Sequence, residues 1–101
     1  MNSSIKEAKR TLINNRRLNY TLHTNTKLYP AQWNWDSAFI ALGYSNFNLD
    51  YSFKELETLI SGQWDDGMIP HILFHIKDLN YTPNYKAWNC GKRVSSSGIT
   101  Q

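Results

Sequence analysis

The stretch YPAQWNWDSAFIALG, residues 29–43, decides which fold the sequence predicts. It begins with a tyrosine, two tryptophans and an aspartate at the junction between a loop and a helix. Pro30 restricts the residue before it to extended backbone, and the carboxylate of Asp36 can accept hydrogen bonds from the free N–H groups of a helix that begins there. The residues that follow are apolar nearly all round, so we predict a helix over 36–46 that is buried on most sides.

The crowding of aromatic and polar side chains in this stretch is typical of a saccharide site. A sugar ring has apolar C–H faces and a rim of hydroxyl groups, so its site needs flat aromatic surfaces beside carboxylate and amide groups. Tyr29, Trp33 and Trp35 supply the surfaces, and Gln32 and Asp36 supply the polar groups. A structural interpretation stays open, in which the two tryptophans belong to the core and Asp36 only caps the helix.

The first predicted helix runs over 4–17 and carries the basic excess of the chain. Ser4 and Glu7 match a capping box at its start. Three apolar side chains fall on one helical face, as packing against a core requires: Ile5, Ala8 and Leu12. Residues 1–30 hold six basic groups and one acidic group, against five and seven in residues 31–101. We interpret the basic face as solvated and expect no nucleic-acid partner, because no nucleic-acid-binding signature accompanies it.

A third helix is predicted over 50–62, with Asp50 as its N-cap and a glycine at its end. Asp66 and the glycine after it form a turn signal. The apolar run 68–74 is interrupted by a proline and predicts a short strand or an extended loop. Residues 76–101 lack apolar periodicity, so we expect them to be mostly irregular. The predicted class is all-α.

A second polar and aromatic cluster occupies residues 62–71, where His71 follows a rigid proline. We expect this histidine to hydrogen-bond a sugar hydroxyl. His71 and His75 have the i, i+4 spacing of a metal pair, but Pro70 weakens a helix there and no third ligand is evident, so we expect no metal and interpret His75 as structural. Cys90 is the single cysteine and cannot form an internal disulfide. No local signature pairs it with a histidine base.

Length and composition exclude several other classes of protein. A chain of 101 residues with 41% hydrophobic and 19% charged residues suits one domain and does not resemble a disordered tail. The longest apolar stretch, residues 38–42, is far shorter than the roughly 20 residues that cross a bilayer, and the polar start lacks the apolar region of a signal peptide. We therefore expect a cytoplasmic protein without a membrane partner.

Three motifs together resemble the N-terminal part of mannosylglycerate and glucosylglycerate hydrolases, which are trehalase-like six-hairpin glycosidases of glycoside hydrolase family 63. The motifs are YPxQWxWDSAFIALG at 29–43, GQWxDGMIPHIxF at 62–74 and SSGITQ at 96–101, with ELExL at 55–59 between the first two. The resemblance extends from about residue 5 to residue 101. It implies an (α/α)6 barrel, two concentric rings of helices, in which residues 1–101 form the N-terminal part of a single domain.

The resemblance also implies inverting hydrolysis of a small α-glycoside, such as mannosylglycerate or glucosylglycerate, without a cofactor. Inversion requires an acid and a base carboxyl group. The resemblance places both downstream, so it implies no catalytic residue in this chain and no activity of the chain alone. It implies substrate-binding roles for Tyr29, Trp33, Trp35 and Asp36 at the glycone, His71 as a further sugar contact, and Tyr81 and Gln101 toward the glycerate. The expected partner is the remainder of the barrel.

Two other interpretations stay open. The chain can be a stand-alone carbohydrate-binding or interaction module, which its aromatic clusters alone would allow, or a non-functional truncated product. In the glycosidase interpretation, both aromatic motifs lie at the ends of neighbouring helices. We therefore expect Trp33, Trp35 and Asp36 to converge with His71 on one side of the molecule.

Overall fold

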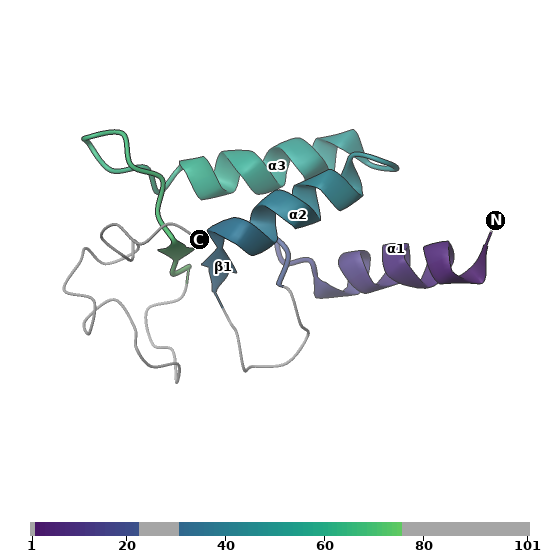
Figure 1. Ribbon diagram of the computed structural model, residues 1–101. Coiled ribbons are helices and arrows are strands. Elements are labelled where there is room, and N and C mark those ends of the chain that lie inside the picture. Colours follow the sequence, from purple (N-terminus) through teal and green to yellow (C-terminus); the bar gives the residue numbers. More distant parts are fainter. Residues whose placement is uncertain (1, 23–30, 76–101) are drawn as a thin grey trace.

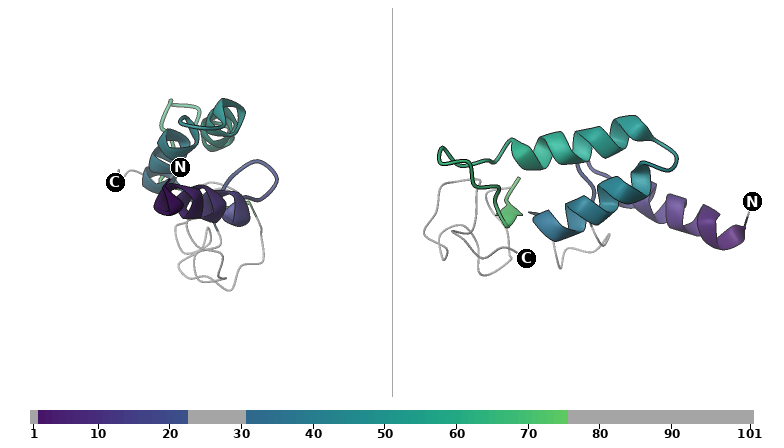
Figure 2. Two further views of the ribbon diagram at one scale, coloured as in Figure 1. Left: turned by 90° about the vertical axis from the view of Figure 1, so that its right-hand side faces the viewer. Right: turned by 45° about the horizontal axis from the view of Figure 1, so that its top comes forward.

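The computed structural model describes residues 2–22 and 31–75, and it is helical, as predicted. The elements follow in the order α1 (Ser3–Asn15), β1 (Gln32–Trp33), α2 (Asn34–Tyr44), α3 (Leu49–Ile60) and β2 (Ile72–Leu73). Figure 1 shows α2 and α3 side by side as a hairpin, with α1 extending away from it. The two further views in Figure 2 show the same arrangement. The expectation for residues 76–101 lies outside the described residues.

The N-caps of α1 and α3 are asparagines that the sequence patterns did not select. The Oδ1 atom of Asn2 accepts a hydrogen bond from the backbone N–H of Ser4 at 2.7 Å, and Asn48 accepts in the same way from Tyr51 at 3.1 Å. The predicted capping box of Ser4 with its glutamate is therefore wrong, as is the predicted cap at Asp50. Asparagine is as good an N-cap as aspartate or serine, which explains why each helix begins earlier than predicted.

Helix α2 begins directly after β1, and the side chain at its N-cap position makes no capping hydrogen bond within the described residues. The N-cap position is Trp33, whose backbone is extended, and Asp36 lies within the first turn of the helix. The prediction that Asp36 is the N-cap is therefore wrong. A carboxylate in the first turn still interacts favourably with the positive end of the helix dipole.

The segment after α3 returns to the start of α2 and pairs with it. Strands β1 and β2 are antiparallel, with Gln32 opposite Leu73 and Trp33 opposite Ile72. This confirms the predicted short strand or extended segment in 68–74. The partner strand was not predicted, because two residues are too few to establish an alternating pattern. Around this pair lies a buried apolar cluster that comprises Ala31, Trp33, Ile72 and Phe74.

Only one face of α2 is covered by the described part of the chain. Its buried residues are Ser37, Ile40, Ala41 and Tyr44. Trp35, Phe39 and Leu42 are 54%, 59% and 62% exposed. The prediction that this helix is buried on most sides is therefore wrong for residues 2–22 and 31–75, since α3 and β1 supply too little surface to cover it.

None of the described helices combines the length and hydropathy that a membrane-spanning helix requires.

Candidate functional site

The junction between β1 and α2 places three of the predicted sugar-binding residues within four positions. Trp33 ends the strand, and its side chain is 8% exposed within the buried apolar cluster. Its burial agrees with the structural interpretation of this tryptophan. Trp35 is exposed and its ring lies 5.6 Å from that of Phe39, in a tilted arrangement. Asp36 is half-buried in the first turn of α2.

His71 lies beside this junction although it is distant in sequence. The backbone N–H of Asn34 donates to the carbonyl of His71 at 2.9 Å, and the Asn34 side chain donates to the carbonyl of Pro70 at 3.2 Å. Burial lowers the pKa of His71, and the negative charge of nearby Asp36 partly opposes that shift. The Nδ1 atom of His71 is buried and has no hydrogen-bond partner within the described part of the chain. The start of α2 and the segment before β2 therefore share one site.

We expected Trp33, Trp35 and Asp36 to converge with His71, and the backbone segments that carry these residues do lie together. Asp36 and His71 lie close enough for their charges to interact, while Trp33 lies one position from Asn34 in the same junction. The side chains divide in a way that the sequence did not predict, because Trp33 is directed into the apolar cluster and Trp35 is exposed. Three further predicted site residues lie outside the described ranges: Tyr29, Tyr81 and Gln101.

A buried carboxylate, Glu55 of α3, lies behind the junction and was not predicted from the sequence. Glu55 is 1% exposed. Its Oε1 atom accepts from the backbone N–H of Thr21 at 2.8 Å, and its Oε2 atom accepts from Nε2 of Gln32 at 3.0 Å and from Oγ of Ser37 at 2.7 Å. Burial raises the pKa of Glu55, and these hydrogen bonds partly oppose the shift. The available signal was its i, i+4 spacing with Leu59, which places it on the buried face of α3.

His75 is held by the same polar cluster. Its Nε2 atom lies 2.9 Å from Oε1 of Gln32, and its ring stacks on Tyr20 with centroids 3.9 Å apart. This confirms the structural interpretation of His75. Within residues 2–22 and 31–75, no group of three or more histidine, cysteine, aspartate or glutamate side chains is arranged to hold a metal ion.

The turn between α3 and β2 is built around Asp66 and Gly67. Oδ1 of Asp66 accepts from the backbone N–H of Met68 at 3.0 Å, while Gly67 has a φ of 98°, a conformation that favours glycine. The N–H of Trp64 donates to the carbonyl of Met68 at 2.8 Å, which closes the turn. The interpretation of Asp66 as a turn residue is confirmed.

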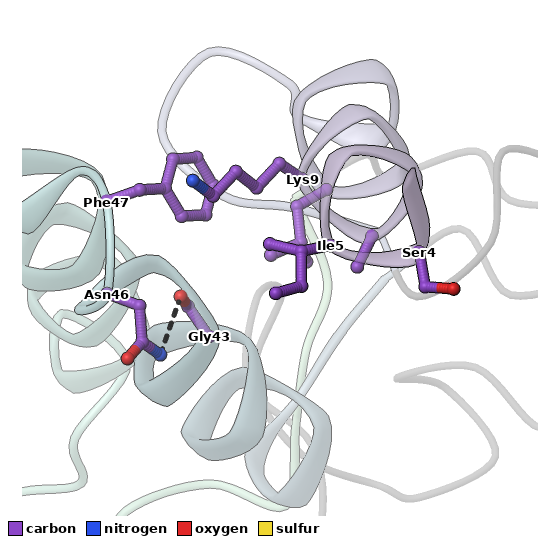
Figure 3. Close-up of a pocket in the computed structure, with 8 residues that line it drawn as sticks. Ser4, Ile5, Lys9, Gly43, Asn46 and Phe47 are labelled. Carbon is purple, nitrogen blue, oxygen red and sulfur yellow. Dashed lines mark hydrogen bonds between the residues drawn. The ribbon is translucent and has the colours of Figure 1, made fainter. Parts of the chain in front are cut away.

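A groove of about 570 Å³ lies apart from the junction, between α1 and the end of α2 (Figure 3). Figure 3 shows the Lys9 ammonium group over the ring of Phe47, 5.2 Å from its centre. The apolar face predicted for α1 lines this groove through Ile5, Ala8 and Leu12. No predicted sugar-binding residue of the described chain lines it. The groove is therefore a feature of how α1 packs and does not belong to the candidate sugar site.

Comparison with known proteins relates the whole chain to one family. Residues 29–101 match the model of the mannosylglycerate hydrolase MGH1-like glycoside hydrolase domain. The mannosylglycerate hydrolase MGH2 of Selaginella moellendorffii is 39% identical over 99 residues, which cover 97% of this chain and 20% of the relative. The mannosylglycerate hydrolase of Thermus thermophilus is 47% identical over 77 residues, covering 73% of this chain and 19% of the relative. The glucosylglycerate hydrolase of Mycolicibacterium hassiacum is 41% identical, covering 73% and 18%.

Solved structures agree with this relationship. The crystal structure of a GH63 mannosylglycerate hydrolase from Thermus thermophilus in complex with Tris has a TM-score of 0.78 and 40% identity, and the match covers 89% of this chain and 22% of that protein. The same enzyme in complex with Tris and D-glycerate gives the same values. This chain thus spans about a fifth of the length of the relatives it matches.

Proposed function

Because this chain belongs to the family of mannosylglycerate hydrolase MGH1-like glycoside hydrolases, we propose that it supplies the glycone-binding, N-terminal portion of an inverting α-glycosidase. The substrate class is a small glycoside of glycerate, mannosylglycerate or glucosylglycerate, since hydrolases of both are among its relatives. The family relationship covers about a fifth of those relatives, so activity is proposed for the assembled barrel and not for this chain alone. The cytoplasmic location remains a prediction from the sequence.

The observation that carries this proposal is the position of Asp36 beside His71 at the start of α2, directly after the exposed Trp35. An exposed indole offers a flat apolar face to the C–H side of a sugar ring. The carboxylate of Asp36 can accept from a pair of hydroxyl groups. The Nδ1 atom of His71 is buried without a partner among the described residues, so it has hydrogen-bonding capacity left over. These are the groups that recognition of a glycone requires, and the hydrogen bonds from Asn34 to residues 70 and 71 hold them together.

The described carboxylates support the proposal that the catalytic acid and base lie elsewhere. An inverting glycosidase needs two carboxyl groups on opposite sides of the scissile bond, roughly 6.5–9.5 Å apart, with room for water. Glu55 is buried and accepts from three donors, so it has no access to a substrate. Asp66 is engaged in its turn. Neither Glu55 nor Asp66 is therefore available as a catalytic partner of Asp36, and we assign Asp36 a binding role.

The exposed apolar surface supports the remainder of the barrel as the partner. Besides the exposed side of α2, helix α3 has Phe53 56% exposed and Ile60 50% exposed. Large apolar side chains gathered on neighbouring helices mark a surface that packs against another element. Further helices of the same barrel would bury this surface, and they would also bring the catalytic pair to the site.

A complementation experiment tests this function. The 101-residue chain is co-expressed with the part of the Thermus thermophilus mannosylglycerate hydrolase that the match does not cover, and the two are purified together as the reconstituted pair. We expect release of glycerate from mannosylglycerate by the pair and by neither component alone. Turnover by the chain alone, or none by a pair that copurifies, would contradict the proposal. Saturable sugar binding by the chain alone, unaffected by the second component, would favour a stand-alone binding module.

A further inference from the structure

We propose that Glu55 is a positioning residue, whose buried carboxylate holds both ends of the segment Gln32–Ser37 and thereby fixes the orientation of Trp35 and Asp36. The inference rests on the proposed sugar-binding role of that segment. It assigns no contact between Glu55 and the substrate, because Glu55 lies behind the segment and is 1% exposed.

The two ends of the segment meet on one oxygen atom. Gln32 precedes Trp33, and Ser37 follows Asp36, so the donors flank the predicted sugar-binding residues. Both donate to Oε2 of Glu55, Nε2 of Gln32 at 3.0 Å and Oγ of Ser37 at 2.7 Å. Nε2 of Gln32 also donates to the backbone carbonyl of Glu55 at 3.0 Å. The backbone between these two donors changes from strand to helix, and the hydrogen bonds to Glu55 set where that change occurs.

The junction needs such a constraint because it lacks the usual one. The N-cap position of α2 is a tryptophan whose side chain makes no capping hydrogen bond, so within the described residues no N-cap side chain fixes the start of this helix. Glu55 acts from the neighbouring helix in its place. It accepts hydrogen bonds from the side chains of Gln32 and Ser37, on either side of the first turn, where a conventional cap would bind the backbone within that turn.

The other oxygen of Glu55 connects the junction to a third segment. Oε1 accepts from the backbone N–H of Thr21, whose hydroxyl lies 2.8 Å from the hydroxyl of Tyr44. Tyr44 in turn donates to the carbonyl of Leu12 in α1 at 2.9 Å. A single carboxylate therefore fixes β1 and α2 relative to the chain that follows α1.

The chemistry of the residue favours positioning over simple stability. All the hydrogen bonds to Glu55 come from neutral donors, and within residues 2–22 and 31–75 it forms no ion pair. Burying a carboxylate without a countercharge is costly, and a well-packed apolar side chain would cost less at such a position. An apolar side chain, however, cannot accept from three donors on three segments. The carboxylate thus provides a geometric constraint that packing alone does not.

A pair of serine variants separates this role from general stability. Ser37→Ala removes a buried 2.7 Å hydrogen bond to Glu55, and Ser52→Ala removes a buried 2.7 Å hydrogen bond from α3 to the carbonyl of Ala41. Each change removes one serine hydroxyl that connects α2 with α3, but only Ser37→Ala removes a hydrogen bond to Glu55. Glu55→Gln is the direct variant, and if it fails to fold, the serine pair decides the question.

Two measurements are made on each variant. Hydrogen exchange in the full 101-residue chain follows the amide of Asn34, which donates to His71 across the junction and does not itself contact Glu55. We expect Ser37→Ala to accelerate this exchange on the order of tenfold, and Ser52→Ala to leave it near the wild-type rate. In the reconstituted pair, we expect Ser37→Ala to raise the KM for mannosylglycerate on the order of tenfold, with no such change for Ser52→Ala.

The outcomes distinguish this inference from the proposed function. Equal exchange rates of the Asn34 amide in the two serine variants would refute the positioning role, whatever the enzyme assay gives. Faster exchange in Ser37→Ala with an unchanged KM would also refute it, because the segment would then be looser without consequence for the sugar. If the wild-type pair hydrolyses no glycoside, the proposed function fails, and the exchange rates still decide whether Glu55 holds the junction.

Discussion

Replacing Asp36 with asparagine separates its structural contribution from its proposed contact with the sugar. The substitution removes one negative charge from the first turn of α2 with little change in size. As a charge near the helix N-terminus, Asp36 stabilises the fold by about 0.3–1 kcal/mol. As a charged acceptor for sugar hydroxyl groups, it contributes about 1.5–3 kcal/mol to binding. Since 1.4 kcal/mol corresponds to about a tenfold change, we expect Asp36→Asn to lower kcat/KM roughly 10- to 150-fold.

Asp50→Asn is the matched control for this experiment. Asp50 lies in the first turn of α3, so the same change removes the same kind of helix-terminal charge away from the candidate site. Both variants should lose a similar small amount of stability in chemical denaturation, and only Asp36→Asn should lose activity on mannosylglycerate in the reconstituted pair. If Asp36→Asn and Asp50→Asn give the same kcat/KM, the carboxylate of Asp36 does not contact the substrate.

Two further predictions concern stability. Burial raises the pKa of Glu55 above its ordinary value of 4.5. Over the pH range between 4.5 and the raised pKa, the folded chain keeps the carboxyl proton of Glu55 and the unfolded chain has lost it. The free energy of unfolding should therefore fall as the pH rises through that range. Chemical denaturation at several pH values should show that this fall in stability is absent in Glu55→Gln. The lowered pKa of His71 gives the opposite dependence, a stability that rises with pH below 6.5, and this should be present in both the wild type and Glu55→Gln. Tyr44→Phe should cost about 1–3 kcal/mol, because it removes a hydrogen-bond partner from the buried Thr21 hydroxyl and from the carbonyl of the half-buried Leu12 in α1. Tyr51→Phe, whose ring packs edge-on against Tyr44, is the control, and an equal loss there would show that the hydroxyl bonds contribute little.

The helices could be predicted from the sequence because their signals are local. Apolar spacing and capping residues lie within one or two turns, so the predicted ranges 4–17, 36–46 and 50–62 match α1, α2 and α3 to within a few residues. The starts were shifted because Asn2 and Asn48 cap instead of the residues two positions later. Strand β1 could not be predicted, since its two residues become a strand only through their pairing with β2.

The candidate site was predictable only in part for the same reason. The composition of 29–43 and of 62–71 indicated aromatic and polar groups suited to a sugar, and the pairing of the two strands brings the described parts of these stretches together. The sequence could not predict that Trp33 is buried and Trp35 exposed, because the direction of each side chain depends on where the strand ends and the helix begins. The role of Glu55 as a buried acceptor could not be predicted, because its partners lie 18 to 34 residues away in sequence, where no periodicity connects them.

The pairing of β1 with β2 has a consequence for how the site forms during folding. The two strands are separated in sequence by the whole helical hairpin, so their pairing closes a long loop. The entropy cost of this closure is offset only when both helices have formed and bring the strands together. Asp36 lies just after one strand and His71 just before the other, on either side of that closure. A ligand held by both residues would bind only the closed form and would therefore shift the equilibrium toward closure. Ordering of the turn at Asp66 and occupancy of the sugar site should then be thermodynamically linked, each favouring the other by the same free energy.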